Sequence, residues 1–355
     1  MGIMLPYEAW FPHRGKGKKM KKNILVLLSV LIILLAFVAC DGNKLTVSNE
    51  VRFFTGIRKA AADSIWALND EIGIWMLDTS GKTYDAIPER YNKRYKADTS
   101  GSISGFIPYY ADASNILRWN DLVNDADKKF DFIAYYPYRT DDQIFTVSGT
   151  TAYLKLDVSA TNAPQDSGKA DVLWGRVDGI ENGASSVSFN LSHKLARLIV
   201  YVKESVTVKE TDLVDDFSIE INGLHTTAQF WLENGQIWFP TGADKKIIMK
   251  DISDTLTQEE KDAGKVRKFE AIVMPEAHSD ALLNRFSLTF TNTPDIFTWE
   301  AKELLSAQRP NVKFESGKQH IYNIRLDAYA PITVIDITVE DWILVNGGDA
   351  VAIVD

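Results

Sequence analysis

The side chains able to carry covalent chemistry are few, and the first of them is a single thiol. Cys40 is the only cysteine of the chain, and it directly follows Phe37-Val38-Ala39. An apolar run from Ile24 to Ala39 separates it from Lys21 and Lys22. That run is shorter than the roughly 20 residues of a membrane-spanning helix. A basic start, a short apolar run and a small residue before the cut are typical of a secretory signal. We therefore expect Cys40 to become the acylated first residue of an exported protein.

This reading assigns the beginning of the chain. Residues 1–39 are predicted to be a signal peptide, with translation beginning at Met20, because the Pro, Trp and basic cluster before Met20 are atypical of a signal. Acylation at Cys40 predicts a lipoprotein held at the outer membrane or cell surface by its lipid anchor, since two or more acyl chains give stable anchoring. The alternative is an uncleaved anchor with an incidental cysteine. A lone cysteine also excludes a disulfide, a CxxC motif and a thiolate metal site.

Catalytic and metal-binding constellations are not found in the sequence. The histidines His193, His225, His278 and His320 are scattered, and no HExxH, GxSxG or P-loop pattern occurs. His193 is in phase with a strand, which favours a hydrogen-bonded structural histidine. We therefore expect a protein that is not an enzyme and that has no metal and no cofactor. The net charge of −9 is spread without a basic stripe, which argues against a nucleic-acid partner.

A second chemical feature is a basic pair beside an apolar strand. Leu45, Val47, Val51, Phe53 and Ile57 all lie at odd positions, which predicts one strand with one buried face. Arg58 and Lys59 follow it at once, ahead of three alanines. A dibasic pair in a small-residue loop is a good site for a trypsin-like protease. We therefore predict residues 40–58 to be a lipidated pro-segment whose strand is removed by cleavage at Arg58 or Lys59.

The end of the chain offers a strand that could replace the one removed. The candidate donor strand runs from Trp342 to Asp355, and four of its apolar residues share odd parity: Ile343, Val345, Val351 and Ile353. Removing a central strand exposes two ladders of backbone donors and acceptors, and a strand from another subunit can satisfy both. Such a head-to-tail contact does not close, so it produces a filament. The alternative is that 45–57 is an ordinary N-terminal strand and that the basic pair is surface charge.

Short alternating apolar runs between turn residues predict an all-β chain of β-sandwiches. The parity of apolar residues changes between Leu195 and Leu198, which predicts a bulge or a bend between sheets near Ala196-Arg197. We place two domains at 59–207 and 208–355. The aromatic run 130–138 is predicted to be a core strand, with glycan stacking as the alternative. Short helices are expected over 113–122 and 257–263.

At these residues the sequence resembles the fimbrillins, the pilus subunits of Bacteroidales such as the major fimbrial subunit of Porphyromonas. The lipoprotein leader, the alternating strand and Arg58 form one block of the resemblance. Residues 192–198 form a second, similar to a family strand with a His/Arg–Ala–Arg core. The third contains an H-x-Y-x-I-x-L strand within 317–326 and a V-x-x-W-x-L-V strand at 339–345. Residues 131–138 and 171–174 also look like fimbrillin sequences.

The resemblance implies two tandem transthyretin-like Greek-key β-sandwiches and a non-enzymatic structural subunit that supports adhesion. It implies that a trypsin-like protease specific for Arg or Lys cuts after Arg58. It further implies that the opened groove takes the C-terminal strand of a neighbouring copy or related pilus subunit. A pilus tip or anchor subunit is the alternative in the same system. The alternative from another class is a surface lipoprotein that binds glycans through Trp174, Trp231 and Trp238.

Overall fold

The computed structural model describes residues 49–58, 65–78, 90–112, 114–119, 129–147, 151–213, 216–239, 244–292, 295–327 and 330–342. Apart from Asn49, these residues belong to one unit of the chain, Glu50–Asp355. Cys40, Leu45, Val47 and Lys59 lie outside the described residues, as do Ile343, Val345, Val351 and Ile353.

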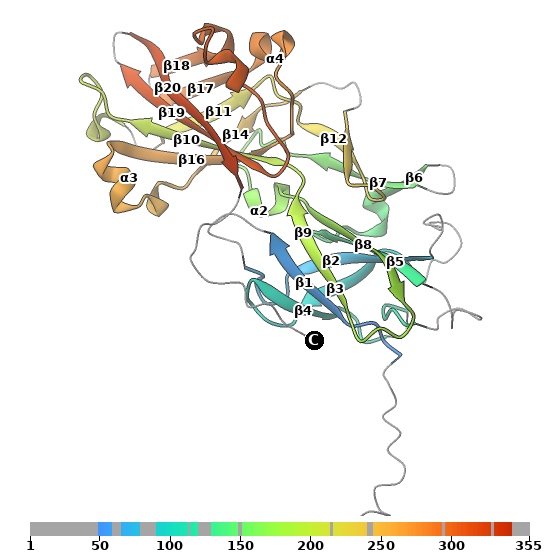
Figure 1. The fold of residues 1–355 in the computed structure, drawn as a ribbon. Coiled ribbons are helices and arrows are strands. Elements are labelled where there is room, and N and C mark those ends of the chain that lie inside the picture. Colours follow the sequence, from blue (N-terminus) through green and yellow to red (C-terminus); the bar gives the residue numbers. More distant parts are fainter. Residues whose placement is uncertain are drawn as a thin grey trace, which may run out of the picture. The chain divides into compact units, whose positions relative to one another are not determined.

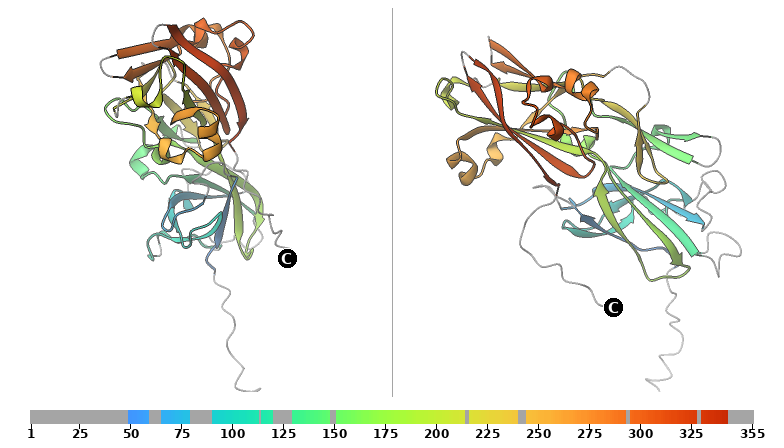
Figure 2. Two further views of the ribbon diagram at one scale, coloured as in Figure 1. Left: turned by 90° about the vertical axis from the view of Figure 1, so that its left-hand side faces the viewer. Right: turned by 45° about the horizontal axis from the view of Figure 1, so that its top comes forward.

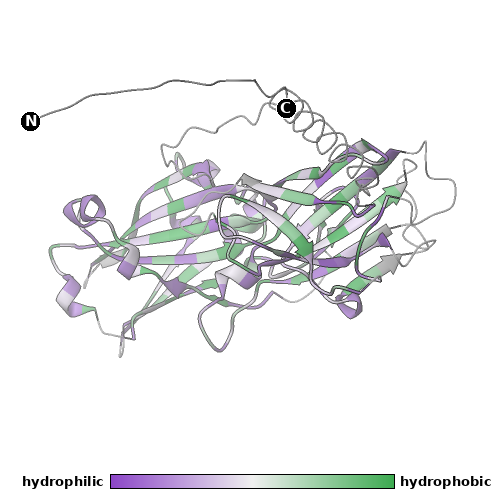
Figure 3. Cartoon of the chain, turned by 90° about the horizontal axis from the view of Figure 1, so that it is seen from below, coloured by the Kyte–Doolittle hydropathy of each residue, from purple (hydrophilic) through white to green (hydrophobic). Residues whose placement is uncertain are grey.

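The first part of the unit is a closed barrel (Figure 1). Its strand order is β1-β4-β3-β2-β5-β8-β9. The strands are β1 (Phe53–Arg58), β4 (Ile103–Pro108), β3 (Lys93–Ala97), β2 (Glu71–Asp78), β5 (Lys129–Tyr136), β8 (Leu173–Glu181) and β9 (Val187–His193). These segments form strands because apolar and polar residues alternate along them. In β9, Val187, Phe189 and Leu191 are buried while Ser188 and Asn190 are exposed, so one face of the strand lines the barrel interior. Figure 3 shows apolar and polar residues interleaved along the strands.

Two further sheets enclose the core of the second part. A five-stranded sheet has the order β15 (Lys250–Asp251), β16 (Lys265–Val273), β10 (Ala196–Lys203), β19 (Lys318–Asp327) and β20 (Ala330–Asp341). A four-stranded sheet has the order β14 (Ile247–Ile248), β11 (Ser218–Asn222), β17 (Ser287–Asn292) and β18 (Asp295–Glu300). The ring of Phe217 packs against Phe269 of β16 and Phe290 of β17, at centroid distances of 5.7 and 6.4 Å. Aromatic contacts therefore join the two sheets.

A third sheet joins strands that are far apart in the sequence. Its order is β13 (Gln236–Trp238), β12 (Thr227–Trp231), β7 (Thr151–Asp157) and β6 (Ile144–Val147). Helices are short: α2 (Ser167–Ala170), α3 (Gln258–Asp262) and α4 (Asp280–Arg285). Turns of 3-10 helix occur at Asp141–Gln143, Glu210–Asp212, Ser253–Thr255, Ala301–Glu303 and Arg309–Asn311. The described part of the chain is thus mostly β, which confirms the predicted class.

The predicted bend between sheets is confirmed. β9 ends at His193 in the barrel, and β10 begins at Ala196 in the five-stranded sheet. β10 pairs there with β16 and, in parallel, with β19. The chain therefore passes from one sheet to another between His193 and Ala196. β7 and β12, which pair with each other, lie on opposite sides of the predicted domain boundary between residues 207 and 208. The domain limits at 59–207 and 208–355 stay a prediction.

Candidate functional site

β1 is held on both edges. It pairs antiparallel with β4, where Phe53 lies opposite Phe106. It pairs in parallel with β9 along its whole length, from Phe53 opposite Val187 to Arg58 opposite Ser192. The blue β1 can be followed beside β9 in the views of Figures 1 and 2. Taking β1 away would leave the facing backbone groups of two strands without partners.

The inner face of β1 fills the barrel. Phe53 and Thr55 of β1 are buried, with 1% and 0% of their surfaces exposed, and Val51 just before the strand is 4% exposed. The Phe53 ring lies 5.0 Å from Tyr95, 5.7 Å from Phe132 and 6.0 Å from Phe189, measured between ring centroids. Burying a phenylalanine side chain is worth about 1.5–3 kcal/mol. Without β1 the barrel would have an apolar groove where Phe53 now lies.

The first residue of the predicted processing pair lies at the end of this strand. Arg58 is the last residue of β1, and its backbone faces Ser192 of β9. Ile57 is in the strand opposite Leu191. The described members of the predicted removable strand, Val51, Phe53 and Ile57, thus lie in β1 or directly before it. Cleavage itself stays a prediction.

The next described segment begins at Ile65, and its Trp66 packs in the core of the same barrel. Trp66 is buried, and its Nε1 donates a hydrogen bond to the carbonyl oxygen of Thr55 at 3.3 Å. Its ring contacts Phe106 and Tyr136 edge-on, at 4.9 and 5.4 Å. Burial raises the pKa of the Tyr136 hydroxyl, which therefore stays neutral. The sequence reasoning missed Trp66, because a single tryptophan outside an alternating run gives no periodic signal. It secures the chain that would remain after cleavage.

The C-terminal candidate begins at a buried tryptophan. Trp342 follows β20, the outermost strand of its sheet in the described chain, and is 4% exposed. Its backbone N–H donates to the carbonyl of Gly317 at 3.1 Å. Its ring stacks on His193 at 3.6 Å with an angle of 16° between the planes. Trp342 therefore packs within its own chain. Its assignment to a donor strand stays a prediction, together with the four apolar residues that follow it.

His193 lies between the end of β1 and the beginning of the C-terminal candidate segment. It is the last residue of β9, next to Ser192, which faces Arg58. Its Nδ1 lies 2.8 Å from a carboxylate oxygen of Asp171. Ile65, His193 and Trp342 line one cavity of about 430 Å³. The burial of His193 agrees with a structural histidine, while its hydrogen bonding stays a prediction. The first described residue after the processing pair and the last before the C-terminal segment border the same cavity.

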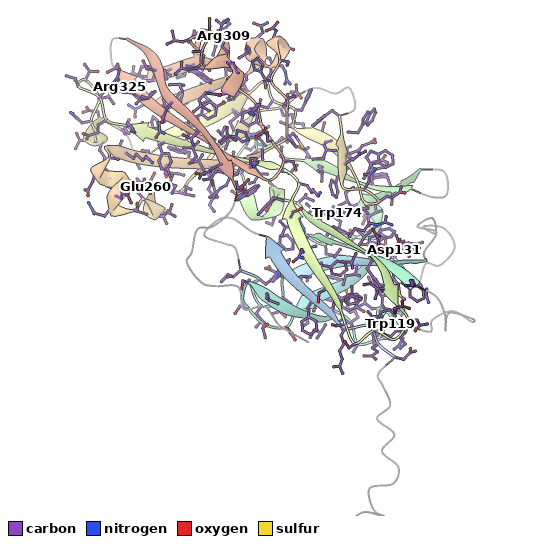
Figure 4. The ribbon with its side chains drawn as sticks, in the orientation of Figure 1. Trp119, Asp131, Trp174, Glu260, Arg309 and Arg325 are labelled. Atoms are coloured by element: carbon purple, nitrogen blue, oxygen red, sulfur yellow. The ribbon has the colours of Figure 1, made fainter. Side chains whose placement is uncertain are left out.

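The three tryptophans considered for glycan binding are not equivalent. Trp174 on β8 (labelled in Figure 4) donates its Nε1 hydrogen bond to the Leu232 carbonyl at 2.8 Å. Lys194 Nζ lies 4.5 Å from its ring centre, and Gly235 packs against the ring so closely that a Cβ there would lie 2.8 Å from it. Trp174 is therefore a packing residue. Trp231 and Trp238 lie on β12 and β13, and Trp238 is exposed.

Within the described ranges, His, Cys, Asp and Glu side chains form no group of three or more able to hold a metal ion. None of the helices found among those residues has the length and apolar character needed to cross a membrane.

The sequence model of the fimbrillin-like family matches residues 59–342. The chain belongs to the fimbrillin-like family. Fimbrillin-like proteins are structural fimbrial subunits and not an enzyme family, so this chain is a fimbrial subunit of the Bacteroides type. Fimbriae are appendages of the cell surface, where the fimbrillin-like chain therefore acts.

Known proteins that are similar to this chain in sequence or in fold have names of the same kind. A candidate fimbrium subunit of Bacteroides uniformis, Fim1C, is 26% identical over 344 residues, covering 93% of this fimbrillin-like chain and 98% of the relative. The crystal structure of a candidate cell adhesion protein from Bacteroides uniformis superposes with a TM-score of 0.59 at 23% identity, covering 82% of this chain and 98% of that one. A similar protein from Bacteroides ovatus gives a TM-score of 0.59 at 17% identity, covering 84% and 99%. The two structures share the fold.

Replacing Phe53 by alanine is expected to destabilise the fimbrillin-like chain by about 3–5 kcal/mol, because it leaves a cavity among three aromatic rings. The control is Phe54→Ala in the same strand, whose side chain is 43% exposed. That change is expected to cost no more than about 0.5 kcal/mol. Denaturant unfolding of the uncleaved chain measures both free energies. Equal losses would show that β1 does not seal the barrel.

Proposed function

We propose that this chain is the stalk subunit of a Bacteroidales-type pilus, exported as a lipoprotein and polymerised by donor-strand exchange after proteolysis. In this proposal Cys40 carries the lipid and tethers the precursor to the outer membrane. A trypsin-like protease cuts at Arg58 or Lys59 and frees the residues before the cut. The subunit consists of two tandem transthyretin-like sandwiches. Its partners are other copies or related pilus subunits.

One observation carries the proposal: the strand that precedes the basic pair is paired on both edges. β1 lies between β4 and β9, and Phe53 contacts three aromatic rings in the interior. Its departure would create what an incoming strand needs, namely two ladders of hydrogen-bonding groups and an apolar groove. An outermost strand would leave one exposed ladder and no such groove.

The remaining chain is arranged to survive that departure. Trp66 is buried against Phe106 and Tyr136, so the segment after the cut keeps its own anchor. At the other end, Trp342 anchors β20 to His193. The segment after Trp342 is rich in apolar residues, and Ile343, Val345, Val351 and Ile353 share odd positions. These features support a subunit that loses its first strand and offers its last.

A tip or anchor subunit would use only part of this cycle. An anchor would keep Cys40 and β1, and a tip subunit would need no donor segment. The two-edge pairing of β1 beside Arg58, together with the apolar C-terminal segment, favours the stalk, because a stalk subunit needs both.

N-terminal sequencing of subunits from sheared surface fibres tests the proposal. A start at Lys59 or Ala60 is the expected result, since cleavage must precede assembly. A start at acylated Cys40 in every assembled subunit would overturn the stalk assignment and favour an anchor. Mass spectrometry of the membrane-bound fraction supplies the control, because the precursor there should retain the lipid on Cys40.

A further inference from the structure

The sheet β13-β12-β7-β6 has one buried face and one outer face. Ala152, Leu154 and Leu156 of β7 are buried, as are Ala228 and Phe230 of β12. Successive side chains of a strand point to opposite faces. The residues between them, beginning with Tyr153 and Trp231, therefore belong to the outer face.

An aromatic row crosses the outer face. Phe145 of β6 lies opposite Tyr153 of β7, and Tyr153 lies opposite Trp231 of β12. The ring centroids are 5.4 Å apart in the first pair and 5.2 Å apart in the second, with interplanar angles of 19° and 52°. Trp238 of β13 faces Gln229 and is the diagonal neighbour of Trp231. Phe145 and Trp238 are 41% and 54% exposed. Three aromatic rings are thus in contact on one outer surface, and Trp238 lies on the same face as their diagonal neighbour.

Along β7, β12 and β13 the rest of this face is polar. The positions beside the row on the same face are Lys155, Gln229 and Gln236. Further along the strand, Asp157 accepts from Lys245 Nζ at 3.0 Å, so charges there are balanced. Among the described outward positions of β7, β12 and β13 none is aliphatic. The surface therefore combines aromatic faces with amide and ammonium groups and has little net charge.

The barrel holds the β12–β13 turn in place. Trp174 Nε1 donates to the Leu232 carbonyl, and Arg176 Nη1 donates to the Glu233 carbonyl at 3.1 Å. Gly235 has a φ of +67° and packs on the Trp174 ring. Two hydrogen bonds and a ring contact fix the hairpin that carries Trp231 and Trp238. A site whose rings are already positioned loses little conformational entropy when a ligand binds.

We propose that this outer face is a binding site for neutral glycans. A pyranose ring presents C–H groups on one side, which pack on aromatic rings, and hydroxyls at its rim, which hydrogen-bond to amides and to an ammonium. The row and its flanking Gln229, Gln236 and Lys155 supply both kinds of group. A balanced charge does not suit a polyanion or an anionic membrane. A protein partner would be expected to meet aliphatic as well as aromatic side chains. The site goes beyond the fimbrial role and does not involve β1.

Affinity electrophoresis tests the proposal, using the protein purified from its own host in the form that the host produces. The native gels contain hydroxyethylcellulose, yeast α-mannan, β-1,4-xylan or galactomannan, so that four polysaccharides with little or no charge are separate arms. We expect retardation in at least one gel. The double variant Trp231→Ala/Trp238→Ala should bind at least about tenfold more weakly, equivalent to about 1.4 kcal/mol. The single variant Trp238→Ala, at the most exposed position of the row, guards against misfolding of the double variant and should also bind more weakly.

The control is Tyr110→Ala, an exposed tyrosine of the barrel region, which should bind as the parent does. Absence of retardation in all four gels would overturn the proposal, and so would equal retardation of parent and Trp238→Ala. Gel filtration adds one more outcome. If the tryptophan variants lose only self-association, the face is a contact between copies and the glycan assignment is wrong. Fibre assembly should be unchanged in Trp238→Ala, which separates this test from that of the stalk function.

Discussion

A precursor with Arg58→Ala and Lys59→Ala is expected to fold and reach the cell surface but to join no fibre. Arg58 is the last residue of β1, and Lys59 is the next residue in the sequence. Without a basic residue at either position, a trypsin-like protease has no site there. β1 would then stay between β4 and β9 and fill the groove that another subunit's strand would need.

The size of the effect follows from competition between an attached strand and a free one. β1 is part of the same chain as its groove, and an attached segment has an effective concentration of order mM. A strand from a neighbouring subunit at μM concentration would face a disadvantage of about a thousandfold for equal contacts. Phe53 and Val51, both buried, add contacts that the incoming strand would have to match. Uncleaved subunits should therefore remain monomers.

Unboiled denaturing gels of surface extracts measure this outcome, since assembled subunits should appear as a ladder and the variant as one band at the precursor mass. The matched control is Lys245→Ala with Lys246→Ala, another adjacent basic pair, which makes surface ion pairs with Asp157 and Glu220. It should assemble normally. Placing a foreign protease site after Arg58→Ala should restore the ladder when that protease is added. A ladder from the unrescued variant would contradict the processing model.

The local pattern of the sequence predicted local structure well. Odd parity at Val51 and Phe53 predicted the buried face of β1, and both are buried. The parity change after Leu195 predicted the change of sheet at Ala196. The run 130–138 proved to contain the core strand β5 and the helix expected over 257–263 is α3. These features succeed because a short periodic pattern acts within one element.

Pairing and contacts between distant segments could not be read from the sequence. Nothing in residues 53–58 indicates β9 as a parallel partner, since the partner is set by the closure of the whole barrel. The helix expected over 113–122 is wrong for the described residues there, because 114–119 form turns and a β-bridge between Arg118 and Glu50. Leu117 and Trp119 are buried in the barrel core, and Figure 4 labels Trp119. Val51 N–H bonds to the Leu117 carbonyl. Tertiary burial overrides the weak helical periodicity of that segment.

The aromatic residues show the same limit. Trp174, Trp231 and Trp238 have similar sequence surroundings, rich in strand and turn residues. Only the fold shows that Trp174 packs under the β12–β13 turn and that Phe145 and Tyr153 join Trp231. A ligand surface built across three strands has no linear motif.

A chain that ends at Trp342 is expected to remain a folded monomer that accepts a strand but donates none. It keeps β20 and the stack of Trp342 on His193. It lacks Ile343 and the apolar residues after it, which form the candidate donor segment. Mixed in small amounts with the full chain, it should shorten fibres, because growth stops wherever it is incorporated.

A chain ending one residue earlier, at Asp341, separates the contribution of Trp342 to stability from the loss of the donor segment. That chain also loses a buried tryptophan, and the empty space beside His193 should cost about 3–5 kcal/mol. The chain ending at Trp342 should unfold within about 0.5 kcal/mol of the full length, because it loses no buried side chain of the described fold. Denaturant unfolding separates the two, and unboiled gels then read out assembly. If the chain ending at Trp342 alone still produces a ladder, the donor strand lies before Trp342, and β20, the outermost strand of its sheet, becomes the candidate.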